Sequence, residues 1–142
     1  MIIFDTGLIV AAADKNDDQH EVAVRLFVEA KLAGERVAVT QMVLAEVCYH
    51  LQERAGSAVE AAFLDSIADR SIRLLELDPE DVRNIAALSR RFAGFPLGGT
   101  DASVAVAADR YGVKKIATFD RRHFPSLTPR SGGHFELLPE SF

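Results

Sequence analysis

The chain has 142 residues, of which 49% are hydrophobic and 26% are charged, and its formal net charge is −5. These values are typical of one compact globular domain. No hydrophobic run is long enough to span a membrane, and the first residues lack the basic start of a signal peptide. The single cysteine, Cys48, excludes an internal disulfide. We therefore expect a single domain over residues 1–142, located in the cytoplasm.

Charge is unevenly distributed along the chain. Residues 1–89 contain 8 basic and 16 acidic side chains, whereas residues 90–130 contain 8 basic and 3 acidic ones. A basic segment of this kind can hold phosphates even on an acidic protein. It is equally consistent with a solvated, arginine-rich surface, so the sequence leaves both interpretations open.

Short apolar segments alternate with helical patterns. In chain order, the patterns predict a strand over 1–4, helices over 7–13 and 18–33, a strand over 36–40, helices over 41–54 and 57–69, a strand over 72–77, helices over 79–93 and 100–111, and strands over 115–118 and 135–138. Three helices carry capping signals. Thr100 is a predicted N-cap, Ser57 and Glu60 predict a capping box, and Asp78 before Pro79 predicts a third cap. Because strands alternate with helices and no hairpin turns join them, we expect an α/β domain with a mainly parallel sheet.

Four acidic residues occupy positions that solvation does not explain well. Asp5 and Asp120 each follow a short apolar strand, and Asp101 lies in the first turn of a helix. Glu46 is the only charge within residues 43–48. The carboxyl ends of parallel strands line the functional crevice of such sheets, so these carboxylates can meet there. Crowded carboxylates repel one another unless a divalent cation neutralises them, and oxygen donors suit Mg²⁺ or Mn²⁺. A metal held in this way can promote phosphodiester hydrolysis.

The chain resembles the PIN-domain ribonucleases, and among them the VapC-like toxins of bacterial toxin–antitoxin pairs. The resemblance covers essentially the whole chain through four motifs in order: Asp5 in IIFDTG, Glu46 in VLAEV, Asp101 in GGTDA and Asp120 in ATFDRRHF. It implies a three-layer fold with a mainly parallel central sheet of about five strands flanked by helices. It also implies a site that binds Mg²⁺ or Mn²⁺, endonucleolytic cleavage of RNA, a homodimer, and inhibition by a cognate antitoxin whose C-terminal segment covers the site.

The resemblance also implies individual residue roles. It assigns metal binding and catalysis to the four acids, and it places Thr6 and Thr118 at hydroxyl positions that support the site. On charge and position, Arg121, Arg122 and Lys115 are candidates for RNA binding.

Two residues depart from the family pattern. Gly7 stands where relatives often have serine, and His123 stands where many relatives carry an acid just before the aromatic residue. The fourth acidic position therefore depends on Asp120 alone. We interpret His123 as a partly exposed loop histidine that lies close enough to Asp120 to touch substrate.

Other functions fit the sequence less well. Asp5-Thr6-Gly7 spells the aspartic-protease triplet, but that chemistry needs two such aspartates in an all-β frame. An aspartyl-phosphate enzyme would want a second aspartate at position 7, and Gly98-Gly99-Thr100 lacks the lysine of a P-loop. The remaining alternative is a PIN-like binding module that no longer cleaves.

Overall fold

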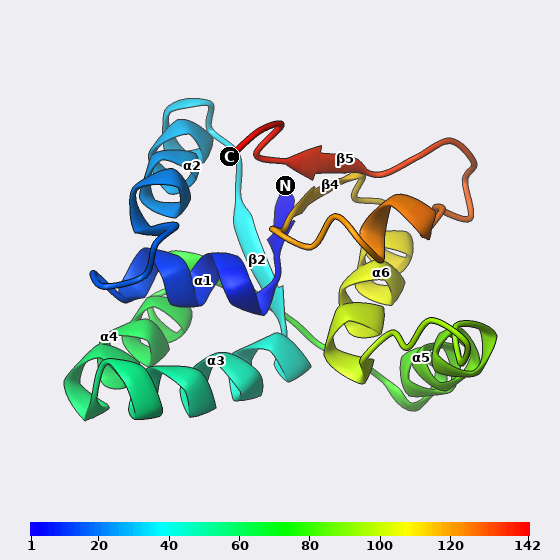
Figure 1. Ribbon diagram of the computed structural model, residues 1–142, viewed down its shortest axis with the longest axis horizontal. Coiled ribbons are helices and arrows are strands. Elements are labelled where there is room, and N and C mark those ends of the chain that lie inside the picture. Colours follow the sequence, from blue (N-terminus) through cyan, green and yellow to red (C-terminus); the bar gives the residue numbers. More distant parts are fainter.

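The computed structural model describes all residues, 1–142, and contains a five-stranded sheet with six α-helices (Figure 1). The strands are β1 (Ile2–Phe4), β2 (Val37–Thr40), β3 (Ile72–Leu75), β4 (Lys115–Ala117) and β5 (Glu136–Leu138). The helices are α1 (Thr6–Ala13), α2 (His20–Leu32), α3 (Gln41–Arg54), α4 (Ser57–Ala68), α5 (Pro79–Arg91) and α6 (Gly99–Tyr111), and a 3₁₀ turn, η1, covers Phe124–Ser126. The strand order is β3-β2-β1-β4-β5, and all neighbouring strands are parallel. The predicted α/β fold with a parallel sheet is confirmed.

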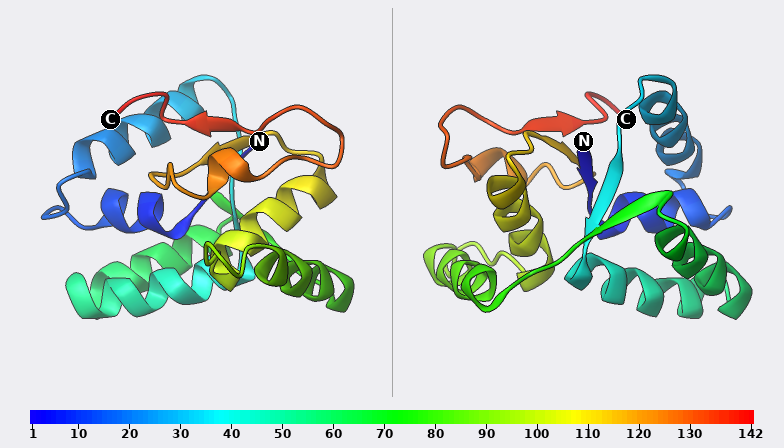
Figure 2. Two further views of the ribbon diagram at one scale, coloured as in Figure 1. Left: turned by 45° about the vertical axis from the view of Figure 1, so that its right-hand side comes forward. Right: turned by 180° about the vertical axis from the view of Figure 1, so that it is seen from behind.

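Helices cover both faces of the sheet. In Figure 1, α1, α2 and α4 lie on one side of the strands and α5 and α6 lie on the other, and Figure 2 shows this division from two further directions. Helix α3 packs against α1, α4 and α6 and so connects the two sides. The central strands β1 and β2 are buried along their whole length, so both faces of the sheet must be covered. None of the helices has the length and hydrophobicity that crossing a bilayer requires.

Helix α6 is buried on nearly all sides. Every residue from Ala102 to Ala108 is buried. The reason is that α6 packs against β1, β2 and β4 and also against α3 and α5. Its small side chains allow these close approaches, and a helix enclosed in this way is apolar all round.

One predicted cap is confirmed and two are wrong. Asp78 caps α5 through its side chain, and Asp81 completes a capping box with it. In contrast, α6 begins after Gly98 and α4 begins after Gly56, and neither helix has a side-chain cap. Thr100 and Ser57 are therefore inside their helices. Gly56 has a φ of 90°, a conformation that glycine adopts without the steric cost that a side chain would add.

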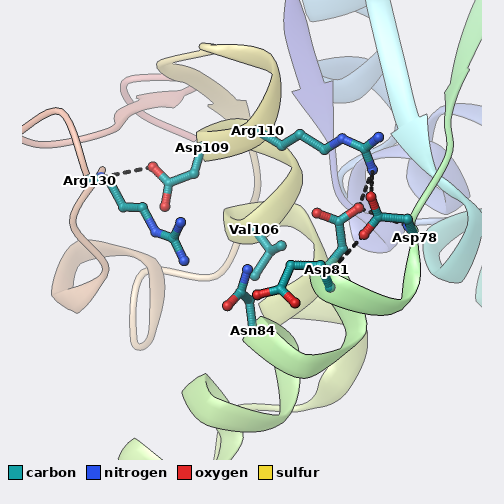
Figure 3. Close-up of a pocket in the computed structure, with 8 residues that line it drawn as sticks. Asp78, Asp81, Asn84, Val106, Asp109, Arg110 and Arg130 are labelled. Atoms are coloured by element: carbon teal, nitrogen blue, oxygen red, sulfur yellow. Dashed lines mark hydrogen bonds and ion pairs between the residues drawn. The ribbon is translucent and has the colours of Figure 1, made fainter.

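A polar pocket of about 270 Å³ lies between α5 and α6 (Figure 3). Asp81 is 5% exposed at this position, and the Arg110 guanidinium donates a hydrogen bond to its carboxylate. The same guanidinium lies 3.4 Å from the Asp78 carboxylate. A buried carboxylate needs such partners, so this network connects the start of α5 to the end of α6.

Asp81→Ala should lower the free energy of unfolding by about 1–2 kcal/mol, because it removes half of the capping box and the buried partner of Arg110. Chemical denaturation measures this loss. Glu80→Ala is the matched control, since Glu80 lies in the same first turn but pairs only with Arg83 on the exposed surface. The control should change the free energy by less than about 0.5 kcal/mol. Equal losses in the two variants would contradict the role assigned to the buried network.

Candidate active site

Asp5 connects β1 directly to α1. It is the N-cap of α1, and its carboxylate accepts a hydrogen bond from the Leu8 N–H at 3.2 Å. Its other carboxylate oxygen accepts from the Thr118 hydroxyl, and the residue is only 6% exposed. The strand passes into the helix without a loop, so one aspartate both caps the helix and faces the carboxyl edge of the sheet.

Thr118 joins two of the acids. It directly follows β4, is fully buried, and its hydroxyl donates to Asp5 while accepting from the Asp120 N–H at 2.9 Å. The hydroxyl can serve both acids because it has one donor and free lone pairs. The structure thus places Thr118 between Asp5 and Asp120, where it can hold them in position.

Asp101, Asp120 and His123 form a compact group. One potential ligand atom from each lies within 4.8 Å of the others. Asp120 accepts hydrogen bonds from the N–H groups of Arg122 at 2.7 Å and His123 at 3.1 Å, and its other oxygen lies 2.8 Å from His123 Nδ1. His123 lies in an irregular segment and is partly exposed, as the sequence predicts, and its side chain, 14% exposed, is bound to Asp120.

Glu46 approaches this group from α3 but is not part of its tightest cluster. It is partly exposed, so its apolar sequence neighbours do not enclose it as the sequence pattern had indicated. Helix α3 packs against α6, and after burial and the charge of Asp120, the charge of Glu46 also contributes to raising the Asp101 pKa.

Two residues that the sequence analysis passed over position these helices. Thr40 caps α3 through a hydrogen bond from the Val43 N–H at 3.1 Å. Its hydroxyl also lies 2.8 Å from the Ser103 hydroxyl on α6, and both residues are fully buried. This contact joins the helix that carries Glu46 to the helix that carries Asp101. Thr40 ends β2 at the same edge as Asp5, so the strand-end rule could have found it.

The carboxylates have unusual proton affinities. Burial raises the pKa of Asp5 to about 7, with smaller contributions from the charges of Asp101 and Asp120, although the hydrogen bonds from Thr118 and Leu8 oppose the shift. Burial also raises the pKa of Asp101 to about 6, helped by the charges of Asp120 and Glu46. For Asp120, burial favours a higher pKa, but the hydrogen bonds from His123 and Arg122 outweigh it and the pKa is lowered.

The donor set suits a divalent cation. Asp5 and Asp101 are in no ion pair, so no side-chain cation within ion-pair distance neutralises them. Thr6, next to Asp5, has the one buried side-chain polar atom without a hydrogen-bond partner, its Oγ1. An unpaired buried hydroxyl beside crowded carboxylates is the arrangement that a bound cation and its waters would complete.

The basic residues of the 90–130 segment do not form one surface around the acids. Lys115 is the first residue of β4, at the opposite edge of the sheet from Asp5, and it pairs with Glu35. This placement does not support the predicted RNA contact by Lys115, since Ile116 and Ala117 of the strand separate it from the carboxyl edge. Arg121 donates to the carbonyl oxygens of Thr118, at 2.8 Å, and Pro139. Arg122 is exposed beside the site.

Comparison with known proteins agrees with this geometry. The PIN-domain family matches residues 2–127, and the chain belongs to this family. More narrowly, it is 30% identical over 138 residues to Ribonuclease VapC26 of Mycobacterium tuberculosis, an alignment that covers 97% of this chain and all of the relative. This similarity places it among the VapC-type members.

Solved structures share the fold. VapC20 of Mycobacterium tuberculosis, described as a toxin that cleaves the sarcin–ricin loop, aligns with a TM-score of 0.76 at 20% identity, covering 86% of this chain and 92% of that one. DNA-bound VapBC from Salmonella typhimurium aligns with a TM-score of 0.69 at 18% identity, covering 96% of both chains. VapBC2 from Rickettsia felis, bound to a promoter fragment, gives 0.64 at 19% identity, covering 89% and 93%.

Asp101→Asn should stabilise the metal-free protein at about pH 8 and have little effect at about pH 4. The folded state raises the Asp101 pKa to about 6, so wild-type stability falls as pH rises through that value and the carboxylate ionises. An amide does not ionise and avoids this loss. Melting temperatures of both proteins in EDTA at the two pH values measure the effect.

Mn²⁺ should then raise the melting temperature of the wild type and raise that of Asp101→Asn far less, because the variant loses a ligand. Asp109→Asn is the control on the same helix; its carboxylate accepts from the Arg130 N–H, away from the acids, and its metal response should match the wild type. If Asp101 were only a favourable first-turn acid, its replacement would lower the melting temperature and leave the metal response intact.

Proposed function

We propose that this chain is a metal-dependent endoribonuclease that acts in the cytoplasm as the toxin of a toxin–antitoxin pair, with residues 1–142 as one PIN domain. The observation that carries the proposal is the group of carboxylates at the carboxyl edge of the sheet, where Asp101 and Asp120 lie together and Thr118 links Asp120 to Asp5. The similarity to Ribonuclease VapC26 supports RNA as the substrate.

The residues at the acidic site would have different roles. Asp5, Glu46, Asp101 and Asp120 would hold Mg²⁺ or Mn²⁺, since both ions prefer oxygen donors. When bound, such a cation lowers the pKa of a coordinated water and offsets charge on the phosphate oxygens. Thr118 holds two of the acids at fixed separation, and Thr6 supplies an additional buried hydroxyl.

Positioning of Asp120 depends on His123. Asp120 is held by two backbone N–H groups and by His123 Nδ1, which must carry the proton because an ionised carboxylate can only accept. A carboxylate fixed by three donors loses little freedom when it binds a cation. Outward of this group, Arg122 is exposed and can contact the phosphates of an RNA strand.

Purified protein should cleave RNA with Mg²⁺ or Mn²⁺, and EDTA should abolish cleavage. Asp5→Asn should lower the cleavage rate by at least about 100-fold, because it removes a charge from the metal-binding group. Gel electrophoresis of labelled RNA measures the products.

Asp14→Asn is the matched control, since Asp14 is a buried acid at the opposite end of α1 and does not face the acidic site. It should leave cleavage within about threefold of wild type. Absence of cleavage by the folded wild type, with either metal, would favour the alternative of a binding module that no longer cleaves.

An apolar groove supports the proposed antitoxin partner. A groove of about 590 Å³ lies between α1, α2 and α4, and every residue that lines it except Ser66 is hydrophobic. Val28 is 50% exposed on this surface, with Ile9 and Phe63 among its other members. An amphipathic antitoxin helix could bury its apolar face here. Solved neighbours include the toxin–antitoxin complexes VapBC and FitAB.

Val28→Glu should weaken antitoxin binding by at least about tenfold, because it introduces an unpaired charge into the apolar groove, while RNA cleavage by the free protein is retained. Leu32→Glu is the control, as Leu32 is 83% exposed one turn further along α2 and does not line the groove. Calorimetry with the purified antitoxin compares the two.

Light scattering of the free protein tests whether the chain forms a homodimer. We propose that the chain assembles as two copies, so the measured mass should be twice that of the 15.5 kDa chain.

If Val28→Glu bound antitoxin as tightly as Leu32→Glu, the groove would not be the docking site of the antitoxin.

A further inference from the structure

One aromatic residue outside the core lies beside the acidic group. Phe95, in the loop 92–98 between α5 and α6, is 39% exposed and is not part of the buried core. Its ring stacks on the imidazole of His123, with the ring centroids 4.4 Å apart and the planes 24° from parallel. His123 contacts Asp120 directly. Two contacts therefore connect the exposed ring to the metal-binding group.

A cationic side chain accompanies this ring. The guanidinium carbon of Arg122 lies 5.4 Å from the centroid of the Phe95 ring. Arg122 is exposed and is in no ion pair, whereas the neighbouring Arg121 is bound to backbone carbonyl oxygens. Arg122 is thus free to turn toward an anion that approaches the acids.

Shielding of His123 from solvent does not by itself explain why the Phe95 ring is exposed with the Arg122 guanidinium next to it. An aliphatic side chain could shield the imidazole, and burying a ring completely would bring more stabilisation than leaving 39% of it in water. An exposed ring in contact with an exposed guanidinium is the combination that binds single-stranded nucleic acid, where bases stack on aromatic rings and cations contact phosphates.

We propose, resting on the RNA cleavage proposed above, that Phe95 and Arg122 form a subsite for a nucleotide next to the bond that is cut. Phe95 stacks on the base, and Arg122 contacts the adjoining phosphate. A base is free to stack on protein only where it is unpaired, so the substrate class is RNA in single strands or loops rather than duplexes. Because every base has a π-face, this subsite selects for unpaired structure more than for sequence.

The absence of tryptophan from the chain provides a direct test. In the double variant Phe95→Trp, Asp101→Asn, the new indole is the only tryptophan, and loss of Asp101 blocks cleavage. Titration with a short oligouridylate in Mg²⁺ at low salt should quench its fluorescence saturably as a base stacks on it. The same length of duplex RNA should quench it far less.

Tyr111→Trp in the same Asp101→Asn background is the matched control. Tyr111 also lies under arginine side chains, but it is ten residues further along α6 than Asp101, roughly 15 Å away. Its fluorescence should not respond to oligouridylate. Anisotropy of fluorescein-labelled oligouridylate, measured in parallel, reports binding independently of stacking.

These readouts separate the possible failures. RNA that binds by anisotropy without quenching the tryptophan at position 95, or that quenches both variants equally, overturns the subsite. RNA that does not bind at all overturns the proposed function and the subsite together.

Steady-state kinetics supply a second measurement in the otherwise wild-type chain. Phe95→Ala should raise KM for unpaired RNA by about tenfold or more with little change in kcat, and Phe95→Tyr should restore it. If Phe95 only supported His123, Phe95→Ala would instead lower kcat and the melting temperature and leave KM unchanged, and the subsite would be rejected.

Discussion

The arrangement of the acidic site depends on the two hydrogen bonds of the Thr118 hydroxyl. The strands β1 and β4 are adjacent and parallel, with Phe4 opposite Ala117, so the residues that follow them lie side by side. At that point Thr118 donates to Asp5 and accepts from the Asp120 N–H, which fixes the acid of one strand relative to the turn after the other. A valine at position 118 would fill similar space but could make neither hydrogen bond.

The acids illustrate two ways of placing a carboxylate out of water. Asp81 is buried, but Arg110 and a capping box satisfy it, and it stabilises the junction between α5 and α6. Asp5 and Asp101 are in no ion pair, and burial raises the pKa of both. Both lie at helix N-termini, where the helix dipole offsets part of the cost of their charge. The remaining repulsion is what a divalent cation would remove, so an arrangement that is unfavourable in the free protein favours metal binding.

Helix α1 extends from the acidic site to the apolar groove. It begins immediately after Asp5, and Ile9, Ala12 and Ala13 on the same helix line the groove. The last of these lies roughly 12 Å along the helix from its start. A helical segment of a partner bound in the groove would therefore end close to the acids, and a short extension of its chain could reach them. Phe95 and Arg122 are exposed near the acids and do not line the groove.

The amino-acid sequence by itself determined the α/β class, the order of strands and helices, and the presence of acids at strand ends and helix starts, because periodicity and strand-end position are local properties. It did not determine that Thr40 and Ser103 join α3 to α6, or that Lys115 forms an ion pair with Glu35. It also assigned the N-caps of two helices to Ser57 and Thr100, whereas Gly56 and Gly98 hold these positions. Each of these features depends on side chains that are distant in sequence or on the backbone freedom of a neighbouring residue. Only the packing of β1 beside β4 and of α3 against α6 brings such groups within hydrogen-bonding distance.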